Sequence, residues 1–389
     1  MTARTTCVRL AAAGVALGLA VGVAACGSSG SSSGGTSAAA KGTIVFGQTV
    51  PQSGPAALYS ESTDGVQAYF ASINASGGVD GHQLKLVAVD DQYEPTVAVE
   101  QTRKLIGQGE FAEVAPNGSA DIAAELPELA KAGIPVVGPQ SGSDFLFAAK
   151  TPSNVFTVWP EYTVDGQALG AYAQKLGLKK VGVLYQDDAF GQTYYKGILA
   201  SGLKPAKVVT YDPTQTDFAP TAEAFKSAGV DGVIVAAIPA PTIAFLNAMA
   251  DLNFYPKRLL SQVSLTPSSY SAAPREVPGS YVGAFIPPLQ TPSSNPQVTA
   301  FDAAMRKYEP GKPVSVFSAW GWMEAQVAVA GLKNISGPMT RPAYMKGLES
   351  IQNLDTLGGK VSYGPGQHHG LSSMFVVKAA SNGAFVPVS

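Results

Sequence analysis

Short apolar runs alternate with helical patterns along most of the chain. The clearest example lies between residues 113 and 144. An apolar run there ends at Pro116, a helical pattern spans Asp121 to Ala132, and a second apolar run covers Ile134 to Val137. Strands covered on both faces are continuously apolar, and a helix between them supplies the crossover of a parallel sheet. This stretch therefore predicts two buried parallel strands joined by a helix.

The same alternation extends before and after this stretch, and it starts again near residue 155. Such a pattern predicts an α/β protein with two lobes, each a doubly wound sheet with right-handed crossovers. Segments Gly359–Tyr363 and Met374–Lys378 are predicted to form a hairpin-like ending. The other predicted strands are Thr43–Thr49, Leu84–Asp90, Val155–Val158, Lys179–Tyr185, Lys207–Tyr211, Val230–Ala237, Arg258–Gln262 and Tyr281–Phe285. Further helices are predicted at Thr96–Ile106, Val164–Leu176, Asn295–Tyr308, Val316–Asn334 and Arg341–Ser350.

Small polar residues follow both apolar runs of the first example, in the turns Asn117–Ser119 and Gln140–Ser143. In an open parallel sheet, ligands bind where the carboxyl ends of strands meet the next helix N-termini. Backbone N–H groups and hydroxyls there can hold a carboxylate or carbonyl without a buried cation. These turns are therefore the candidate binding site. The alternative is that Asn117 to Ser119 only cap the following helix, as Ser and Asn commonly do.

The length, composition and charge of the chain indicate a globular protein and exclude some classes of function. With 389 residues the chain is long enough for two domains, and 46% hydrophobic against 14% charged residues is typical of a globular protein. The 26 basic and 28 acidic residues include no basic cluster. Since nucleic-acid binding needs a concentrated positive face, no nucleic-acid partner is expected.

The N-terminus has the pattern of an export signal. Arg4 and Arg9 precede an apolar run, Leu10 to Val23, that is too short for a comfortable membrane span. The run leads into Ala24-Ala25-Cys26, which resembles a bacterial lipoprotein signal whose cleavage leaves Cys26 first, with a diacylglycerol on its sulfur. The alternative is an ordinary secretory signal with an incidental cysteine. We predict a signal peptide at 1–25 and a lipid-anchored cysteine with a flexible Gly/Ser tether at 26–41.

Several motifs carry a family resemblance. They are Thr49–Pro55 (TVPQSGP), Ile73–Gly81 (INASGGVDG), Asp90–Pro95 (DDQYEP) and Ala132–Val137 (AGIPVV). Together they resemble the branched-chain amino-acid (Leu/Ile/Val) binding proteins of ABC importers, which have the type I periplasmic-binding fold, here in lipoprotein form. The resemblance covers residues 42 to 385. It implies a protein that closes two lobes over a small ligand at the extracellular face of the cytoplasmic membrane and delivers it to ABC permease and ATPase subunits.

The resemblance also implies how the chain divides. Three crossovers would join the lobes, near Trp159-Pro160, Phe285–Pro288 and Thr356–Gly359. Hinges fall in such segments, which are short in secondary structure. The N-terminal lobe would comprise residues 42–159 plus 287–357, and the C-terminal lobe 160–286 plus 358–389.

Carried over residue by residue, the family's ligand clamp in the first lobe falls on the two polar turns. Ser119 would offer its hydroxyl and backbone N–H to a carboxylate. Tyr59 matches an aromatic residue in the first turn that would wall the pocket, and the alternative is an exposed tyrosine at a helix start. Trp320 or Phe317 would reach the ligand from the start of a long helix, although core packing is the alternative. The second turn would add donors from Gln140, Ser141, Gly142 and Ser143.

The second lobe departs from the family pattern at two positions. Phe190 stands where the amino-acid binders have a tyrosine, and Gln262 lies in a stretch where they hold the ligand ammonium with a glutamate. An ammonium buried without a carboxylate partner is costly. The ligand is therefore predicted to be a small amphipathic solute: a branched-chain or other hydrophobic amino acid, or a related small carboxylate or amide. An alternative stays open, in which the missing negative charge comes from Asp187, Asp188 or Glu161.

Other chemistry has little support. His368-His369 is the one histidine pair and is interpreted as a solvated loop, with a metal site as the alternative. The pairs Asp90-Asp91 and Asp187-Asp188 are interpreted as helix caps or hinge braces. No phosphate-binding loop ending in Gly-Lys-Ser/Thr occurs, and no Gly-x-Ser-x-Gly elbow lies at a predicted strand–helix junction. No catalytic residue, metal or cofactor is expected, and the alternative function is a ligand sensor that signals to a membrane receptor kinase.

Overall fold

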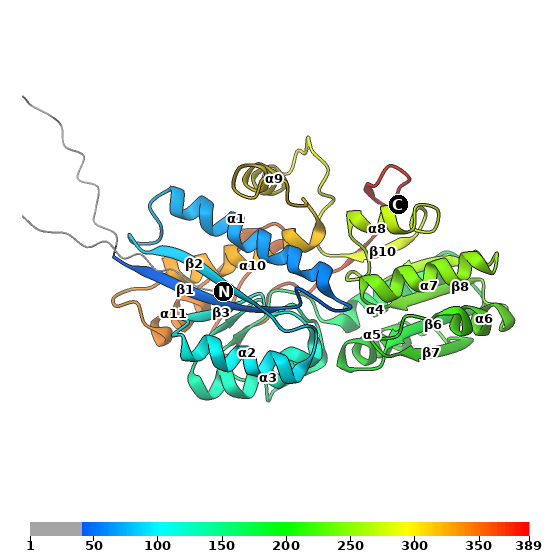
Figure 1. Ribbon diagram of the computed structural model, residues 1–389, viewed down its shortest axis with the longest axis horizontal. Coiled ribbons are helices and arrows are strands. Elements are labelled where there is room, and N and C mark those ends of the chain that lie inside the picture. The colour runs from blue at the N-terminus through cyan, green and yellow to red at the C-terminus, as the bar shows by residue number, and fades with distance from the viewer. Residues whose placement is uncertain (1–40, 389) are drawn as a thin grey trace, which may run out of the picture. The chain divides into compact units, whose positions relative to one another are not determined.

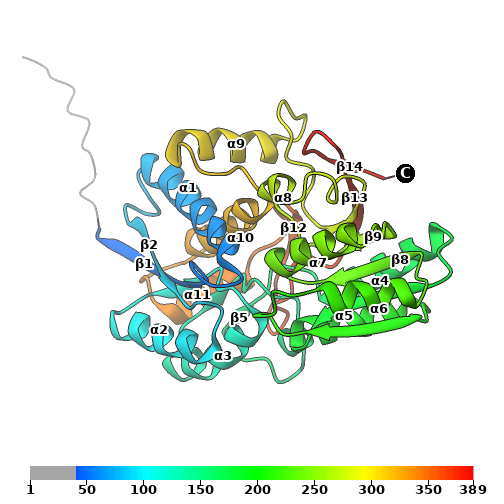
Figure 2. The same ribbon diagram turned by 45° about the vertical axis from the view of Figure 1, so that its right-hand side comes forward.

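The computed structural model of the protein describes residues 41–388. Two sheets of mainly parallel strands, each with helices on both faces, form two lobes (Figure 1 and Figure 2). Within the described residues, no helix combines the length and apolar content needed to cross a lipid bilayer. The predicted signal peptide, the lipid-bearing Cys26 and the tether as far as residue 40 lie outside the described residues.

The first sheet has the strand order β2-β1-β3-β4-β5, with every pair parallel. Helix α1 packs with α10, and α2 packs with α3. Val50 at the end of β1 lies opposite Asp90 at the end of β2, so the turns after both strands are neighbours. The strands are β1 (Thr43–Val50), β2 (Gln83–Asp90), β3 (Ala112–Val114), β4 (Val136–Val137) and β5 (Val155–Phe156). The helices are α1 (Glu61–Ala75), α2 (Pro95–Gly107), α3 (Ser119–Ala132) and α10 (Val316–Lys333).

The second sheet has the order β14-β13-β10-β9-β8-β6-β7. Its parallel part, read as β7-β6-β8-β9-β10, repeats the topology of the first sheet, and β13 and β14 extend it with antiparallel pairs. The predicted fold class, two doubly wound α/β lobes, is confirmed. The strands are β6 (Val181–Gln186), β7 (Lys207–Tyr211), β8 (Gly232–Ala236), β9 (Lys257–Leu260), β10 (Tyr281–Ala284), β13 (Phe375–Ala379) and β14 (Phe385–Pro387).

The remaining helices cover these sheets. Helix α4 packs with α5, α6 with α7, α9 with α1, and α11 with α10. They are α4 (Tyr162–Lys175), α5 (Ala189–Ala200), α6 (Ala219–Ser227), α7 (Pro239–Asp251), α8 (Pro267–Ala272), α9 (Pro296–Tyr308) and α11 (Arg341–Glu349). Two 3₁₀ helices, η1 (Ala57–Ser60) and η2 (Asp144–Leu146), follow β1 and β4.

Helix α10 is buried along almost its whole length, which explains its continuously apolar sequence. A capping box between Ser315 and Ser318 fixes its start. Where α10 crosses α1, Gly65 brings the two backbones together, because a Cβ at this position would lie 1.8 Å from the carbonyl oxygen of Ser318. The end of α10 that approaches the other lobe is therefore held rigidly.

The predicted hairpin-like ending is wrong. β12 (Gly359–Val361) pairs with β11 (Leu354–Thr356), whereas β13 pairs with β10 and β14. Thr356–Gly359, where a crossover was predicted, form the turn of the β11–β12 hairpin. That hairpin is fastened to α10, where Gln326 Oε1 accepts the N–H of Leu357 at 3.1 Å. The chain leaves the hairpin through residues 362–374, and the predicted lobe boundaries stay predictions.

Candidate functional site

A small cavity lies where strand ends of the two lobes meet. It is bordered by the loops after β1 and β3 of the first sheet and after β6 and β8 of the second. In both sheets these two strands are neighbours whose connections run in opposite directions, which is the switch point where doubly wound sheets bind ligands. The cavity volume is about 10 Å³, room for about one water molecule. The residues lining it are Tyr59, Tyr93, Asn117, Gly118, Ser119, Gln140, Trp159, Tyr162, Phe190, Ile238 and Val263.

Three serine hydroxyls form a buried cluster on the first-lobe side. Ser119, the first residue of α3, has its Oγ 2.8 Å from Ser141 Oγ, and Ser143 donates its hydroxyl to Ser119 Oγ at 2.9 Å. The alternative role of Asn117 to Ser119 as side-chain caps of the following helix is not observed. The N-cap residue is Gly118, and no side chain caps α3. Helix N-termini carry free N–H groups and partial positive charge. The serine cluster and the start of α3 thus present neutral donors suited to a carboxylate or a carbonyl.

Gln140 braces this side of the cavity. Its Oε1 accepts a hydrogen bond from Asn117 Nδ2 (2.9 Å), and its Nε2 donates to Glu324 Oε2 on α10 (2.8 Å). Burial raises the pKa of Glu324 well above its usual range, which favours the neutral carboxyl. Gly138 permits the approach, since its φ is +63° and a Cβ there would lie 2.4 Å from Glu324 Cγ. Gln140 is therefore held in place from two sides.

Aromatic side chains close the cavity and tie the lobes together. The Tyr59 hydroxyl donates to the carbonyl oxygen of Val263 in the second lobe at 3.0 Å. Phe190 is buried against Tyr162, with ring centroids 5.2 Å apart. A second bridge runs from Gln186 Nε2 to the Tyr93 hydroxyl at 3.1 Å. The arrangement is a closed one, with its walls in contact.

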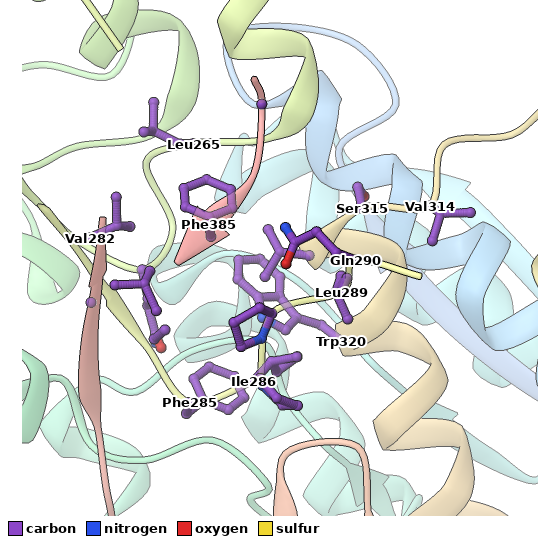
Figure 3. Close-up of a pocket in the computed structure, with 18 residues that line it drawn as sticks. Leu265, Val282, Phe285, Ile286, Leu289, Gln290, Val314, Ser315, Trp320 and Phe385 are labelled. Atoms are coloured by element: carbon purple, nitrogen blue, oxygen red, sulfur yellow. The ribbon is translucent and has the colours of Figure 1, made fainter. Parts of the chain in front are cut away.

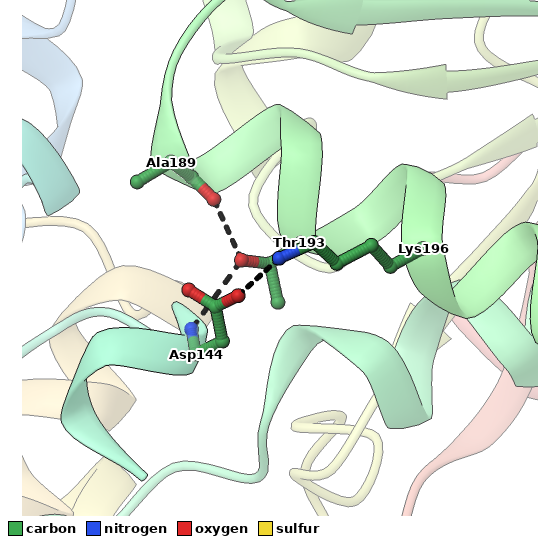
Figure 4. Close-up of polar contacts among 4 residues, drawn as sticks. All are labelled: Asp144, Ala189, Thr193 and Lys196. Atoms are coloured by element: carbon green, nitrogen blue, oxygen red, sulfur yellow. Dashed lines mark hydrogen bonds and ion pairs between the residues drawn. The ribbon is translucent and has the colours of Figure 1, made fainter. Parts of the chain in front are cut away.

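Polar groups join the lobes at the rim of the site (Figure 4). The backbone N–H of Asp144, in η2 of the first lobe, donates to Thr193 Oγ1 on α5 at 3.3 Å. Thr193 in turn donates to the carbonyl oxygen of Ala189 at 2.7 Å, and Lys196 forms an ion pair with Asp144. Of these contacts the Lys196–Asp144 ion pair is exposed, and surface ion pairs contribute little energy each.

None of the residues lining the cavity carries a charged side chain. Asp187, Asp188 and Glu161 are not among them. Asp188 instead caps α5 by accepting the N–H of Gly191 at 3.1 Å. The lining itself thus has no carboxylate to pair with an ammonium group, and the nearby acids include Asp188 and Asp121, whose charges add to burial in raising the pKa of the lining Tyr93.

The comparisons with known proteins agree with this geometry. Residues 43–384 match the sequence profile of the periplasmic binding protein family. The chain belongs to this family. The Leu/Ile/Val-binding protein homolog 7 of Brucella abortus (strain 2308) is 25% identical over 350 residues, which cover 85% of this chain and 86% of the relative.

Two solved structures place this periplasmic binding protein in the type I fold. A possible leucine/isoleucine/valine-binding protein from Rhodopirellula baltica SH 1 has a TM-score of 0.83 at 21% identity, covering 91% of this chain and 98% of the other. A fatty acid ABC transporter substrate-binding protein from Thermomonospora curvata has a TM-score of 0.81 at 20% identity, with 89% and 91% covered. At these identities the likeness shows the fold alone.

The predicted site residues of the binding protein fall into three groups. Tyr59, Ser119, Gln140 and Phe190 line the interlobe cavity. Ser141 and Ser143 reach it through Ser119, and the carbonyl of Gly142 accepts the N–H of Tyr162 at 2.7 Å. Gln262 and Trp320 line a second, larger cavity instead (Figure 3).

Sequence reasoning missed part of the lining. Tyr93, Ile238 and Val263 each follow the end of a strand, so their position was a usable signal. Their residue types were not, because apolar and aromatic residues after strands usually enter the core. Trp159 was expected only as a hinge, yet its ring lines the cavity.

The histidine pair is also placed differently from the prediction. His368 is only 8% exposed; it stacks on Phe156 with centroids 4.0 Å apart, and its Nε2 lies 3.1 Å from Glu349 Oε1. The prediction of a solvated loop is thus wrong for His368, because the loop packs against the end of the first sheet. Among residues 41–388, no group of three or more His, Cys, Asp or Glu side chains could hold a metal ion.

Proposed function

We propose that the protein captures a small amphipathic solute by closing its lobes and delivers it to an ABC permease with its ATPase subunits. The observation that carries this is the uncharged interlobe cavity, with a buried serine cluster on one side and aromatic walls on the other. The similar proteins carry names of Leu/Ile/Val binding and of fatty-acid transport, so one fold serves ligands with and without an ammonium group.

The residues that line the cavity favour some small amphipathic ligands over others. Neutral donors at Ser119 and at the start of α3 suit a carboxylate or an amide carbonyl, and Phe190 with Trp159 suits an apolar body. No lining carboxylate pairs with an α-ammonium. We therefore propose a small carboxylate or amide in preference to a branched-chain amino acid.

Binding would require the lobes to separate, because the closed cavity has a volume of only about 10 Å³. Opening breaks the Tyr59–Val263 and Gln186–Tyr93 hydrogen bonds, and a ligand restores the closed form only by binding it more tightly than the open one. The closed, loaded form would be the one presented to the permease.

We also propose that a lipid on Cys26 anchors the protein at the extracellular face of the cytoplasmic membrane. The support is the signal-like sequence that precedes Cys26 and the tether that follows it. Recovery of Cys26→Ala in the membrane fraction as fully as the wild type would exclude this anchor.

The test of the proposed function is a calorimetric screen of hydrophobic amino acids, aliphatic and aromatic carboxylates and small amides. For any ligand found, Ser119→Ala should weaken binding by about 1–3 kcal/mol, because a charge-assisted hydrogen bond is lost. It should also lower the stability of the empty protein, because the buried hydroxyls of Ser141 and Ser143 lose a partner. Ser72→Ala is the matched control, since its hydroxyl bonds only the carbonyl of Tyr69 within α1. If Ser119→Ala lowers the stability of the empty protein but binds the ligand as tightly as the wild type does, Ser119 has a structural role alone.

A further inference from the structure

A second cavity, with a volume of about 230 Å³, lies beside Trp320 (Figure 3). It is bounded by β10 and the segment 285–290 that follows it, by the start of α10, and by the C-terminal strands β13 and β14. Trp320 lies between the two cavities: it lines this one, and its ring is 4.5 Å from that of Trp159, which lines the interlobe cavity. We refer to it as the hinge pocket, because residues 285–288 were predicted as a crossover.

The hinge pocket is apolar and uncharged. Leu265, Val282, Phe285, Leu289 and Phe385 supply much of its wall, and none of the residues lining it carries a charged side chain (Figure 3). An engineered apolar cavity of about 150 Å³ is enough to bind benzene. The hinge pocket therefore has room for the apolar body of a small molecule.

One polar side chain in this wall has no partner. Gln262 is 4% exposed, and neither its Oε1 nor its Nε2 has a hydrogen-bond partner. Its backbone is anchored separately, since the N–H donates to Asp165 Oδ2 at 3.1 Å. Buried amide groups are almost always paired, and an unpaired one is costly. The two amide atoms lie beneath the pocket wall, so Gln262 can give one donor and one acceptor to a bound molecule once its side chain turns into the pocket.

We propose that the hinge pocket binds a small carboxamide with an apolar body, its head paired with the Gln262 side chain. A carboxamide supplies the acceptor for Nε2 and the donor for Oε1 within one planar group. A carboxylate would be buried without a cation and would leave Oε1 unpaired, and an ammonium would be buried without an anion. This site is distinct from the interlobe cavity and goes beyond the proposed transport function.

The test titrates cyclohexanecarboxamide into the purified protein by calorimetry at pH 7, with cyclohexanecarboxylate as the charged comparison. The amide should bind with one site per chain, and the carboxylate at least tenfold more weakly. Gln262→Leu should weaken amide binding tenfold or more, since two hydrogen bonds are lost. Val282→Phe should do the same by filling the pocket. Gln192→Leu, which changes an exposed glutamine on α5, is the matched control and should bind as the wild type does.

Stability separates a binding effect from a folding defect. Gln262→Leu removes an unpaired buried amide, so its melting temperature should equal or exceed that of the wild type. The proposal is overturned if the wild type does not bind the amide, or if Gln262→Leu and Val282→Phe, both folded, bind it normally. Loss of binding in Ser119→Ala alone would place the amide in the interlobe cavity. Equal affinity for the carboxylate would overturn the preference for an uncharged head.

Discussion

Glu324 is fully buried on α10, and its Oε2 accepts a hydrogen bond from the Nε2 of Gln140. Because burial raises its pKa well above the usual range, this side chain acts as a neutral acceptor and not as a charge. Gln140 in turn holds Asn117, so the polar turns of the candidate site are braced from the helix behind them. The donors that would face a ligand are thus positioned by a residue that does not line the cavity.

We predict that Glu324→Gln is tolerated, because an amide keeps the acceptor and the volume of a neutral carboxyl. Glu324→Leu should unfold with about 1–3 kcal/mol less free energy than Glu324→Gln, since it leaves the Gln140 amide buried without a partner. Urea denaturation of both variants measures the difference. Equal stability of the two would show that the Gln140–Glu324 hydrogen bond contributes nothing net.

At the scale of elements, helix and strand patterns were informative where the segments were long and apolar. The strand predicted at Thr43–Thr49 is β1, and the helix predicted at Val316–Asn334 is α10, each within one residue at either end. β12 falls within the strand predicted at Gly359–Tyr363, but its hairpin with β11 was missed because β11, LDT, is short and largely polar. Strand β14 ends in a proline, which is confined to sheet edges and weakens the strand signal.

The residues of the candidate site, like the helices and strands, were predictable only in part. Turns after β3 and β4 were predictable because small polar residues after buried strands indicate ligand binding. From the second lobe Phe190 was predicted, whereas Val263 and Ile238 were not, because their apolar side chains gave no sign that they meet the other lobe. Such contacts join residues far apart in the sequence, as in the 3.0 Å bond from Tyr59 to Val263, and no local pattern encodes them.

The crossing of α1 and α10 gives an element-scale prediction. Gly65→Ala should lower the free energy of unfolding by about 1–3 kcal/mol, because its Cβ would overlap the backbone of α10 and force the helices apart. Gly107→Ala, at the end of α2, is the matched control: nothing lies within 4 Å of its Cβ, so it should be neutral or slightly stabilising. Thermal unfolding compares the two. A neutral Gly65→Ala would mean that the crossing tolerates greater separation.

For the whole molecule, buried acids on the first lobe set how stability depends on pH. Burial raises the pKa of Asp91 to about 8 and that of Asp121 to about 7, and it also raises the pKa values of Glu113 and Glu125. In the unfolded chain such groups titrate near pH 4. Between those values the folded protein binds more protons than the unfolded chain, so stability falls as pH rises.

We therefore expect the melting temperature to drop by about 5 °C or more between pH 5.5 and pH 8, measured by calorimetry at constant ionic strength. Asp91→Asn should flatten this dependence, because the amide cannot ionise while its Oδ1 can still accept the N–H of Tyr93, a bond of 2.9 Å in the parent chain. Asp187→Asn, which replaces an exposed carboxyl, should leave the slope unchanged. A melting temperature that rises toward pH 8 would mean that these carboxyls ionise in the folded protein without the burial cost on which the argument depends.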